Sequence, residues 1–515
     1  EWYNAGTQVT LTAYGTSPNP GTRYIFTSWS GSGSGSYSGT NNPITITMNG
    51  PITETANSQE QFYLTMEANP SGAGSVSPGS GWYNAGTQVS ISETPNSGWV
   101  FESWSGSGSG SYSGTSSSAT ITMNGPITET ANYYVTITFS ESGIPSGATL
   151  SSALLTLSYG GNTYQYAPSQ LPVTIAIAPG TSITFSWTSP AYGISSYSGI
   201  RYIWQSTSGL STAQSATITV NTPGSVVATY NVQYQLTFEQ SGLPSSATGT
   251  VLSLTVGGSS YSYTVSGLPA QFWIPAGDSI SFSWASPVYD SAPGIRYLWG
   301  STTDNFGASL GQSGSFSMPS QAATVQGNYG GPSGTQYLLT MQVDPSGAGS
   351  TNPAVGSYWE SAGAVISIGA TPNSGWIFSS WTGSGSGSYS GTLQYPSITM
   401  NGPINETANF YPTITFEESG IPSGTPGTIL TVSYSGNTLT YTASQLPVTL
   451  AVPPNTQVSY SWTNPVSVGP GTQYALTGVS GPSSPATVNS PTIVAATYGE
   501  QYLVQTFANP SSGGS

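Results

Sequence analysis

Carboxylates recur at one fixed place along this chain. Glu54, Glu129 and Glu406 occupy the same position of a segment that reads NGPITETAN twice and NGPINETAN once. Hydrolysis of a sugar bond needs two carboxyl groups about 5–10 Å apart, whereas each segment offers one. Glu417 and Glu418 are adjacent, and on a strand they would point to opposite faces. We therefore interpret the repeated glutamates as structural groups at a turn or a strand edge.

Serine hydroxyls are abundant, but no residue is present that could activate them. The chain has no His, no Lys and no Cys, and a serine nucleophile needs a neighbouring base such as His or Lys. Without Cys and His the usual zinc and iron sites are excluded. Without Lys, so are the Walker-type phosphate loop and Schiff-base chemistry. We expect no enzyme, no catalytic residue, no cofactor and no metal.

The glycine-rich segment SGSGSGSYSGT recurs at residues 30–40, 105–115 and 382–392, the last copy beginning with Thr382. A phosphate cradle would need a following Lys or a helix N-terminus, and the sequence predicts neither. We interpret the segment as an ordered β-hairpin loop in which a fixed tyrosine docks on a neighbour. These tyrosines are Tyr37, Tyr112 and Tyr389.

Charge is scarce in this chain of 515 residues. Charged residues make up 4%, and the net charge of −15 includes only three cations, which argues against a nucleic-acid partner. Model carboxylates, with pKa values of about 4, would mostly protonate near pH 2 at little loss of ion pairs. We expect an extracellular protein exposed to acid and heat; a low-charge surface protein at neutral pH is the alternative.

The start of the sequence has neither Met nor a signal peptide. We interpret this as processing, or as a window cut from a longer precursor. No apolar run approaches the roughly 18–20 residues needed to span a bilayer, so we expect no membrane span in this chain.

Two kinds of repeat organise the chain. The short repeat contains YLTMEANPSGAGS, then YNAGTQV, then TITMNGPITETAN; the long repeat opens with strands such as VTITFSESGIPSG and continues into LPVTIAIAPGTSITFSW. We assign short repeats to 1–59 (without its first strand), 60–132 and 336–410, long repeats to 133–231, 232–330 and 411–499, a linker to 331–335, and an orphan first strand of a short repeat to 500–515.

Period-2 alternation and β-branched residues, separated by Gly/Pro/Asn/Ser clusters, predict an all-β chain. We expect a linear array of small β domains. The long repeats should be immunoglobulin-like sandwiches of about seven strands, and the short repeats smaller sheets or grasp-like units. The joints are so short that we predict a fairly stiff rod, with a hinge only at 330–335.

The short repeat resembles the divergent internalin-type B-repeat, a module of bacterial and archaeal surface proteins. The resemblance rests on YNAGTQVTL, on F-x-S-W-x-G and on the closing T-x-T-A-N. The long-repeat motif FEESGIPSG resembles, more loosely, repeats in cell-surface proteins of acid-loving archaea. Both resemblances imply extracellular display without a catalytic site.

Aromatic residues recur on alternating strand positions, where we expect them to fill cores rather than bind sugars. The repeated tryptophans are Trp104, Trp187, Trp284, Trp381 and Trp462. The three arginines, Arg23, Arg201 and Arg296, each precede aromatic residues, so we expect stacking or a local carboxylate partner. Asn405 begins the sequon Asn-Glu-Thr and is a candidate glycosylation site; Ser/Thr density also permits O-glycans.

The tail QYLVQTFANPSSGGS matches the first strand of a short repeat when the tail and the complete short repeats are aligned on their Asn-Pro or Asp-Pro dipeptides. We predict that this donor strand contributes Tyr502, Val504, Thr506, Phe507 and Ala508. A one-residue slip would instead turn Leu503 and Phe507 inwards. The predicted acceptor, the incomplete repeat 1–59, contributes Trp2, Val9, Leu11, Phe26, Trp29, Ile44, Ile46 and Met48.

An unfilled sheet edge invites strand addition from another chain, and a head-to-tail contact that does not close gives a filament. We therefore predict a pilus-like extracellular filament of identical subunits, with cell surfaces or other filaments as further partners. A fragment of a giant adhesin or surface-layer protein is the main alternative. A carbohydrate-binding module and the stalk of a secreted protease are further ones.

Overall fold

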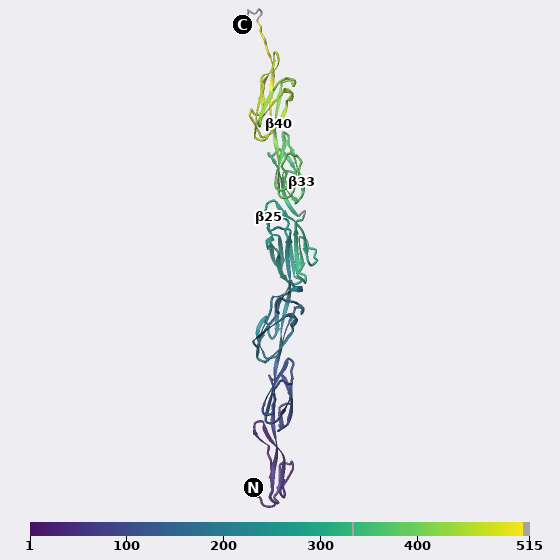
Figure 1. Cartoon of the computed structure of the whole chain (residues 1–515), viewed down its shortest axis with the longest axis vertical. Coiled ribbons are helices and arrows are strands. Elements are labelled where there is room, and N and C mark those ends of the chain that lie inside the picture. The colour runs from purple at the N-terminus through teal and green to yellow at the C-terminus, as the bar shows by residue number, and fades with distance from the viewer. Residues whose placement is uncertain (332–333, 508–515) are drawn as a thin grey trace. The chain divides into compact units, whose positions relative to one another are not determined.

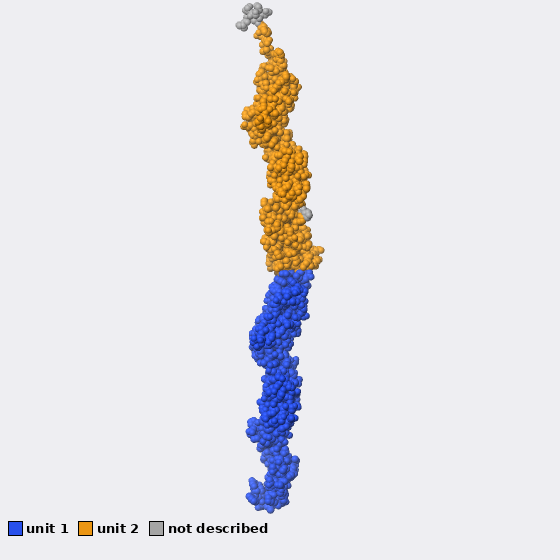
Figure 2. Space-filling view, in the orientation of Figure 1, with its two compact units in different colours: residues 1–235, 273–277, 318–322 blue, residues 236–272, 278–317, 323–515 orange. Residues whose placement is uncertain are grey.

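The computed structural model describes residues 1–331 and 334–507 (Figure 1). The described chain is built from β-strands, which confirms the predicted fold class, and its only helices are four 3-10 turns, Pro168–Gln170, Ser195–Tyr197, Val265–Gly267 and Ala443–Gln445. Among these residues, no helix is long and apolar enough to cross a membrane. Residue contacts divide the chain into two compact units: 1–235 with 273–277 and 318–322, and the remainder (Figure 2).

The second short repeat, in the first unit, is a small two-layer sandwich. One layer has the strand order β7-β5-β11-β9, and the other β10-β8-β6. It has no α-helix in its described residues, so the grasp-like alternative is not seen. Its strands are β5 (Thr53–Asn69), β6 (Gly74–Ser77), β7 (Gly81–Asn84), β8 (Gln88–Pro95), β9 (Trp99–Ser107), β10 (Ser118–Thr122) and β11 (Ile127–Ser142).

The core of this sandwich lies between the two layers, because period-2 alternation sends every second side chain inwards. Leu64 from the first strand is fully buried with Ile91, Trp104 and Met123. The first strand is therefore a central part of the domain. It pairs antiparallel with β7 and parallel with β11.

The first short repeat has fewer strands: β1 (Gln8–Leu11), β2 (Thr16–Asn19), β3 (Thr22–Ser32), β4 (Ile44–Thr47) and the first part of β5. β1 pairs with β4, and β3 pairs with residues 53–62 of β5. Its small core contains Trp29, Ile44 and Ile46.

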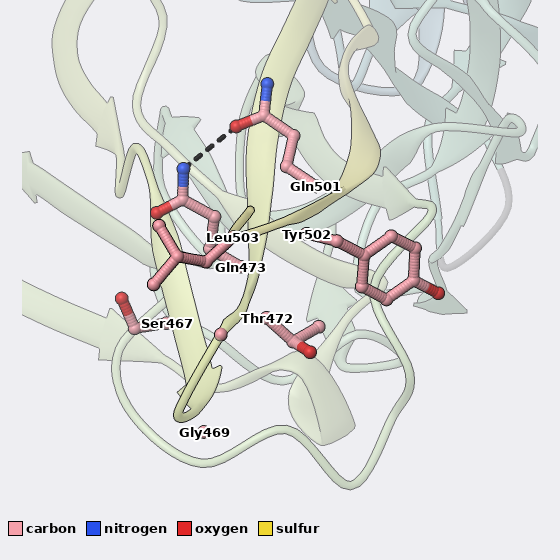
Figure 3. A pocket seen from close by; sticks show the side chains of 8 residues that line it. Ser467, Gly469, Thr472, Gln473, Gln501, Tyr502 and Leu503 are labelled. Carbon is pink, nitrogen blue, oxygen red and sulfur yellow. Dashed lines mark hydrogen bonds between the residues drawn. The ribbon is translucent and has the colours of Figure 1, made fainter. Parts of the chain in front are cut away.

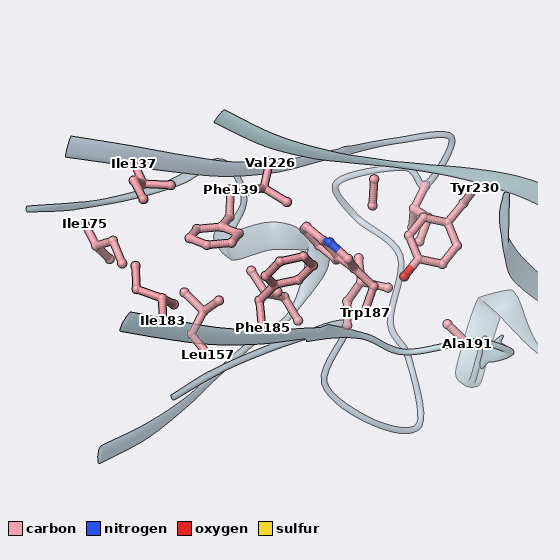
Figure 4. Close-up of a cluster of buried hydrophobic side chains, with 14 of the residues drawn as sticks. Ile137, Phe139, Leu157, Ile175, Ile183, Phe185, Trp187, Ala191, Val226 and Tyr230 are labelled. Atoms are coloured by element: carbon pink, nitrogen blue, oxygen red, sulfur yellow. The ribbon is translucent and has the colours of Figure 1, made fainter. Parts of the chain in front are cut away.

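The first long repeat is a larger sandwich. β11 and β19 (Gly224–Ser241) run parallel in one layer, and the order β13-β12-β15-β18 forms the other. Phe139, Phe185 and Trp187 fill the space between the layers (Figure 4). It has nine strands rather than about seven; the others are β12 (Leu155–Tyr159), β13 (Asn162–Tyr166), β14 (Val173–Ile177), β15 (Thr181–Trp187), β16 (Ala191–Tyr192), β17 (Ile200–Gly209) and β18 (Ser215–Val220).

The second unit repeats both designs. In its long repeats β22-β21-β24-β28 and β39-β38-β41-β44 form four-stranded layers, and the short repeat has the order β32-β30-β37-β35. The strands of the second long repeat are β20 (Ala247–Thr248), β21 (Leu252–Val256), β22 (Ser259–Tyr263), β23 (Ala270–Ile274), β24 (Ser279–Trp284), β25 (Val288–Asp290), β26 (Ile295–Tyr297), β27 (Trp299–Asp304), β28 (Ser313–Ser317) and β29 (Ala323–Tyr329).

The third short and third long repeats complete this unit. The short one has β30 (Thr335–Asp344), β31 (Gly349–Asn352), β32 (Gly356–Ser361), β33 (Val365–Ser367), β34 (Gly369–Pro372), β35 (Trp376–Ser384), β36 (Ser397–Thr399) and the start of β37 (Ile404–Ser419). The long one adds β38 (Leu430–Tyr434), β39 (Asn437–Tyr441), β40 (Val448–Ala451), β41 (Thr456–Trp462), β42 (Val466–Gly469), β43 (Thr472–Ser480), β44 (Ala486–Val488) and β45 (Thr492–Tyr502).

Four strands cross repeat boundaries without a break. β5, β11, β19 and β37 each end one repeat and begin the next. The exception is the boundary between β29 and β30, where a gap separates Tyr329 from Thr335. Residues 332–333 of the predicted linker 331–335, and of the hinge at 330–335, lie outside the described residues.

Candidate subunit-joining site

Neighbouring repeats are joined by one backbone geometry, first seen between the two short repeats of the first unit. Thr22, at the start of β3, pairs with Phe62 of β5. The backbone N–H of the next residue, Tyr63, donates to the carbonyl of Gly21 at 2.9 Å. The residue after that, Leu64, turns into the core of the next repeat and is fully buried. This joint therefore fixes which residues of the crossing strand point inwards.

The same hydrogen bond occurs at the other four internal boundaries, with N···O distances of 2.8–2.9 Å. The donor and acceptor residues are Thr136 and Gly98, Gln235 and Gly199, Leu338 and Gly294, and Thr413 and Gly375. Each acceptor glycine has a positive φ, a conformation that residues with a Cβ rarely adopt. The joint thus depends on the backbone and is independent of which repeat follows.

Each joint glycine also lies against a side chain of the following repeat. A Cβ built on Gly21 would approach the Cβ of Pro126 to 2.9 Å, and one on Gly294 would approach the Cβ of Pro403 to 3.0 Å. Pro126 and Pro403 belong to the NGPI segments of complete short repeats. The corresponding proline of the first short repeat is Pro51.

Each of the three arginines lies at a joint, where it contacts a tryptophan of the following repeat. Arg23 donates from Nε to Oε1 of Gln61 at 2.8 Å, and its guanidinium carbon lies 4.3 Å from the ring centroid of Trp82. Such cation–π contacts are attractive because the ring face is electron-rich. The other two clamps repeat the arrangement, with Arg201, Gln233 and Trp273 and with Arg296, Gln336 and Trp359. The predicted stacking is therefore observed.

The tail leaves the last long repeat with the same geometry. Thr472 of β43 pairs with Tyr502 of β45, and the backbone N–H of Leu503 donates to the carbonyl of Gly471 at 2.8 Å. Gln473 replaces the arginine and donates from Nε2 to Oε1 of Gln501 at 2.8 Å (Figure 3). Residues 503–507 thus follow the last long repeat with the same backbone geometry that leads into the next repeat at the internal joints.

This register assigns a place to each tail side chain. Val504 takes the position of the fully buried Leu64, and Phe507 takes that of the exposed Glu67. Residues 501–507 are all exposed here. Within the predicted donor strand, Phe507 therefore belongs to the outward face, and Ala508 lies outside the described residues.

The first short repeat has an open groove where its siblings hold the first strand. Residues 53–57 of β5 pair with β3 along one edge; within the described chain nothing pairs along the other. Positions fully buried in the second repeat are half-buried or exposed in the first. These pairs are Ile127 and Ile52, Glu129 and Glu54, Ala131 and Ala56, Met123 and Met48, and Ile91 and Leu11.

The groove has a volume of about 310 Å³ and is lined by Glu1, Tyr3, Val9, Leu11, Ile46, Met48, Ile52 and Glu54. Most of its wall is apolar, as expected for a surface that a strand covers in the sibling repeats. Seven of the eight predicted acceptor residues belong to the core cluster of this repeat, and four of them line the groove. The seven are Val9, Leu11, Phe26, Trp29, Ile44, Ile46 and Met48, and those in the groove are Val9, Leu11, Ile46 and Met48.

Trp2 is placed differently from the other predicted acceptor residues. Its side chain is fully exposed, and its counterpart Trp82 lies at the joint under Arg23 rather than in the core. Tyr3, Ile52 and Glu54 line the groove but were not among the predicted residues. Comparison of Tyr3 with Tyr83, which packs against the core of the second repeat, could have identified it.

The repeated glutamates hold the glycine-rich loops. Oε1 of Glu129 accepts a hydrogen bond of 2.7 Å from the backbone N–H of Tyr112, and Glu406 does the same for Tyr389. Burial raises the pKa of both carboxyl groups, although these hydrogen bonds oppose the shift. A Cβ on Gly106 would lie 2.8 Å from Oε1 of Glu129, so the glycine leaves room for the carboxylate. Both glutamates hold their loops from buried positions on central strands, and not from the turn or strand edge that was expected.

The tyrosine of each glycine-rich loop packs against the hydrophobic core of its own repeat, as the sequence predicts, and it also closes its own loop. The Tyr112 hydroxyl accepts a hydrogen bond of 3.4 Å from the backbone N–H of Ser116, and a Cβ on Gly114 would overlap its ring. The repeated tryptophans are core residues as expected: four are fully buried and Trp462 is half-buried against the core. Asn405 is exposed on β37, between β30 and β35.

Comparison with known families supports the resemblance of the short repeats. The model of the divergent InlB B-repeat domain matches residues 1–61, 64–141 and 339–414. These segments cover the short repeats and the first strands of two long repeats. The likeness of the long repeats to surface proteins of acid-loving archaea stays a prediction.

No curated protein matches the chain in sequence. Among solved structures, the Bacillus anthracis TIE protein has 9% identity and a TM-score of 0.21, over 86% of this chain and 75% of that one. A C-terminal fragment of the pilus adhesin SpaC from Lactobacillus rhamnosus GG has 12% identity and a TM-score of 0.13, over 53% of this chain and all of the fragment. The open form of SpaC has 10% identity and a TM-score of 0.14 over 98% of this chain, which spans 55% of SpaC. Scores this low carry no functional argument.

Proposed function

We propose that this protein is the structural subunit of an extracellular filament. In this assembly, residues 501–515 of one copy fill the groove of the first short repeat, residues 1–59, of the next copy. The match of the short repeats to a surface-protein module supports a place at the cell surface. The assembly needs no enzyme activity and no cofactor.

The observation that carries the proposal is that one chain has both an open groove and a strand in the register that would fill it. Residues 53–57 offer a sheet edge that no described residue pairs with, above an apolar wall. The tail carries Val504 into the position that Leu64 fills in the complete repeat. Strand addition of this kind gains backbone hydrogen bonds and buries apolar side chains at once.

The sibling repeats also supply the expected pairing. Parallel pairing of Leu64 with Ile127 in the second repeat corresponds to Val504 with Ile52 of the next copy. Antiparallel pairing of Tyr63 with Trp82 corresponds to Leu503 with Trp2. The contact is heterologous, since it joins different surfaces of two copies, and repeated addition therefore extends a fibre.

The test compares the chain 1–515 with a variant that ends at residue 499. Electron microscopy should show fibres for the full chain and separate particles for the shortened one. A synthetic peptide of residues 500–515 should bind the shortened variant at one site and protect amides of residues 53–57 from hydrogen exchange. Fibres formed by the shortened variant, or a peptide that does not bind, would contradict the proposal.

The alternative is a longer repeat protein, in which a preceding segment of the same chain fills the groove. Unbroken strands at four of the five internal boundaries favour this reading, because tandem extension would use the same joint. The length of the native polypeptide distinguishes the two. Denaturing electrophoresis of native fibres should give a chain close to 52.9 kDa for the filament subunit, and a much longer one for the alternative.

A further inference from the structure

The internal joints obey a pairing rule between two side chains. Three joints place an arginine of one repeat over the ring of a tryptophan of the next. At the two joints from a short to a long repeat, Val100 and Ile377 hold the arginine position, opposite Tyr134 and Tyr411. There the tryptophan position is held by Ala176 and Ala451, opposite Thr136 and Thr413. The second position is thus a tryptophan where the arginine position holds a long polar side chain, and an alanine where it holds an aliphatic side chain.

Near its two ends the described chain presents the two halves of such a joint, each without its counterpart among the described residues. Trp2 holds the tryptophan position and is fully exposed. At the other end Gln473 holds the arginine position and keeps the hydrogen bond to the strand glutamine, Gln501. Gly471 has only the Cβ of Leu503 near its own Cβ position, at 3.9 Å, among the described residues.

Both end faces are hollowed. A hollow of about 520 Å³ at the exit of the tail is lined by Ser467, Gly469, Gly471, Thr472, Gln473, Gln501, Tyr502 and Leu503 (Figure 3). One of about 530 Å³ at the head is lined by Glu1, Trp2, Tyr3, Ala5, Met48, Asn49, Gly50, Pro51 and Ile52. At the internal joints the matching residues contact each other, as Gly21 contacts Pro126 and Arg23 contacts Trp82.

We propose that these two faces dock on each other between copies, beyond the inserted strand itself. In this joint Pro51 of the next copy lies on Gly471, and the indole of its Trp2 lies against the side-chain amides of Gln473 and Gln501. The proposal rests on the proposed filament. Because Gln473 has no positive charge, the joint lacks the cation–π contact of the three internal clamps. The joint between subunits is therefore the weakest of the tryptophan-bearing joints in the fibre.

The test restores the missing cation. A donor copy carries Ile52→Arg to block its own groove, and an acceptor copy ends at residue 499, so that mixing gives only a 1:1 complex. Gln473→Arg in the donor should tighten this complex about 2- to 5-fold, the size expected of an exposed cation–π contact. Trp2→Ala in the acceptor should abolish the gain. Affinities are measured by analytical ultracentrifugation for all four combinations.

The outcomes separate the docking faces from the filament. If complexes form but Gln473→Arg has the same effect with Trp2 and with Ala at that position, the strand is donated and the docking contact is wrong. If no combination forms a complex, the proposed function fails and the docking contact fails with it. A gain that depends on Trp2 supports both.

Discussion

The backbone N–H of Leu503 donates to the carbonyl of Gly471 at 2.8 Å, as Tyr63 donates to Gly21 within the chain. By this equivalence Leu503 should pair with Trp2 of the next copy, as Tyr63 pairs with Trp82. The chain has no Cys, so an introduced pair can only join to itself. The double variant Trp2→Cys, Leu503→Cys should therefore give a ladder of disulfide-linked oligomers on non-reducing gels.

The internal pair provides a matched control for this crosslink. The variant Tyr63→Cys, Trp82→Cys should form an intramolecular disulfide, because antiparallel cross-strand pairs have suitable Cα separations of about 4.5–5.5 Å. A second control, Trp2→Cys with Gln505→Cys, is two residues out of register and should crosslink poorly. A ladder that is equally strong for both end-to-end pairs would argue against the assigned register.

The tail register makes a second prediction. Val504→Asp should prevent fibre formation, because it would place a carboxylate where Leu64 is fully buried in the sibling repeat. Phe507→Ser should leave fibres intact, since its position corresponds to the exposed Glu67. Electron microscopy of both variants checks this. Loss of fibres with Phe507→Ser alone would show that the strand inserts with a one-residue slip.

The sequence alone predicted much of this architecture, because repetition and period-2 alternation are local signals. The all-β class and the burial of Trp104 and Trp187 follow from alternation within single strands. The arginine clamps were harder to specify, since Gln61 and Trp82 come from different strands and meet Arg23 only at a boundary between repeats. The sequence around Arg23 is therefore compatible with stacking and with a carboxylate partner alike.

The register of the tail shows the same limit. Alternation gives two possible faces for residues 502–507, and nothing within the strand chooses between them. The choice is made by the hydrogen bond to Gly471, a residue about thirty positions upstream. Tyr3 was missed for a related reason: its core-facing role shows only when it is compared with Tyr83 in a complete repeat.

Protonation of the buried glutamates makes a third prediction. Burial raises the pKa of Glu129, so the folded state binds a proton more tightly than the unfolded state. The ionised Glu129 carboxylate therefore destabilises the folded state when the pH is above its raised pKa. This destabilisation is relieved as the pH falls through the raised pKa towards about 4.5, the pKa of the unfolded state. Glu129→Gln should therefore stabilise the second short repeat at pH 7, and it should do so to a smaller extent at pH 3.

Hydrogen exchange of the Tyr112 amide measures this effect, because that N–H donates to Glu129. Its protection should increase in the Gln variant at pH 7, and the difference from the parent should narrow in acid after correction for intrinsic exchange. Glu406→Gln, with Tyr389 as the reporter, provides an independent copy of the experiment. A parent that loses protection as the pH falls would contradict the predicted sign.

The joint glycines make the last prediction. Gly21→Ala should destabilise the first unit in two ways. Its φ of +74° strains any residue with a Cβ, at about 1 kcal/mol, and the new methyl group would lie 2.9 Å from the Cβ of Pro126. Gly180→Ala is the matched control, since its φ is +84° but nothing lies within 4 Å of the Cβ position.

Gly471→Ala should resemble this control in the isolated subunit and resemble Gly21→Ala in the fibre, where Pro51 of the next copy takes the place of Pro126. Thermal unfolding is measured for isolated subunits and for fibres. If Gly471→Ala and Gly180→Ala lower the unfolding temperature equally in both states, the proposed contact between Gly471 and Pro51 is wrong.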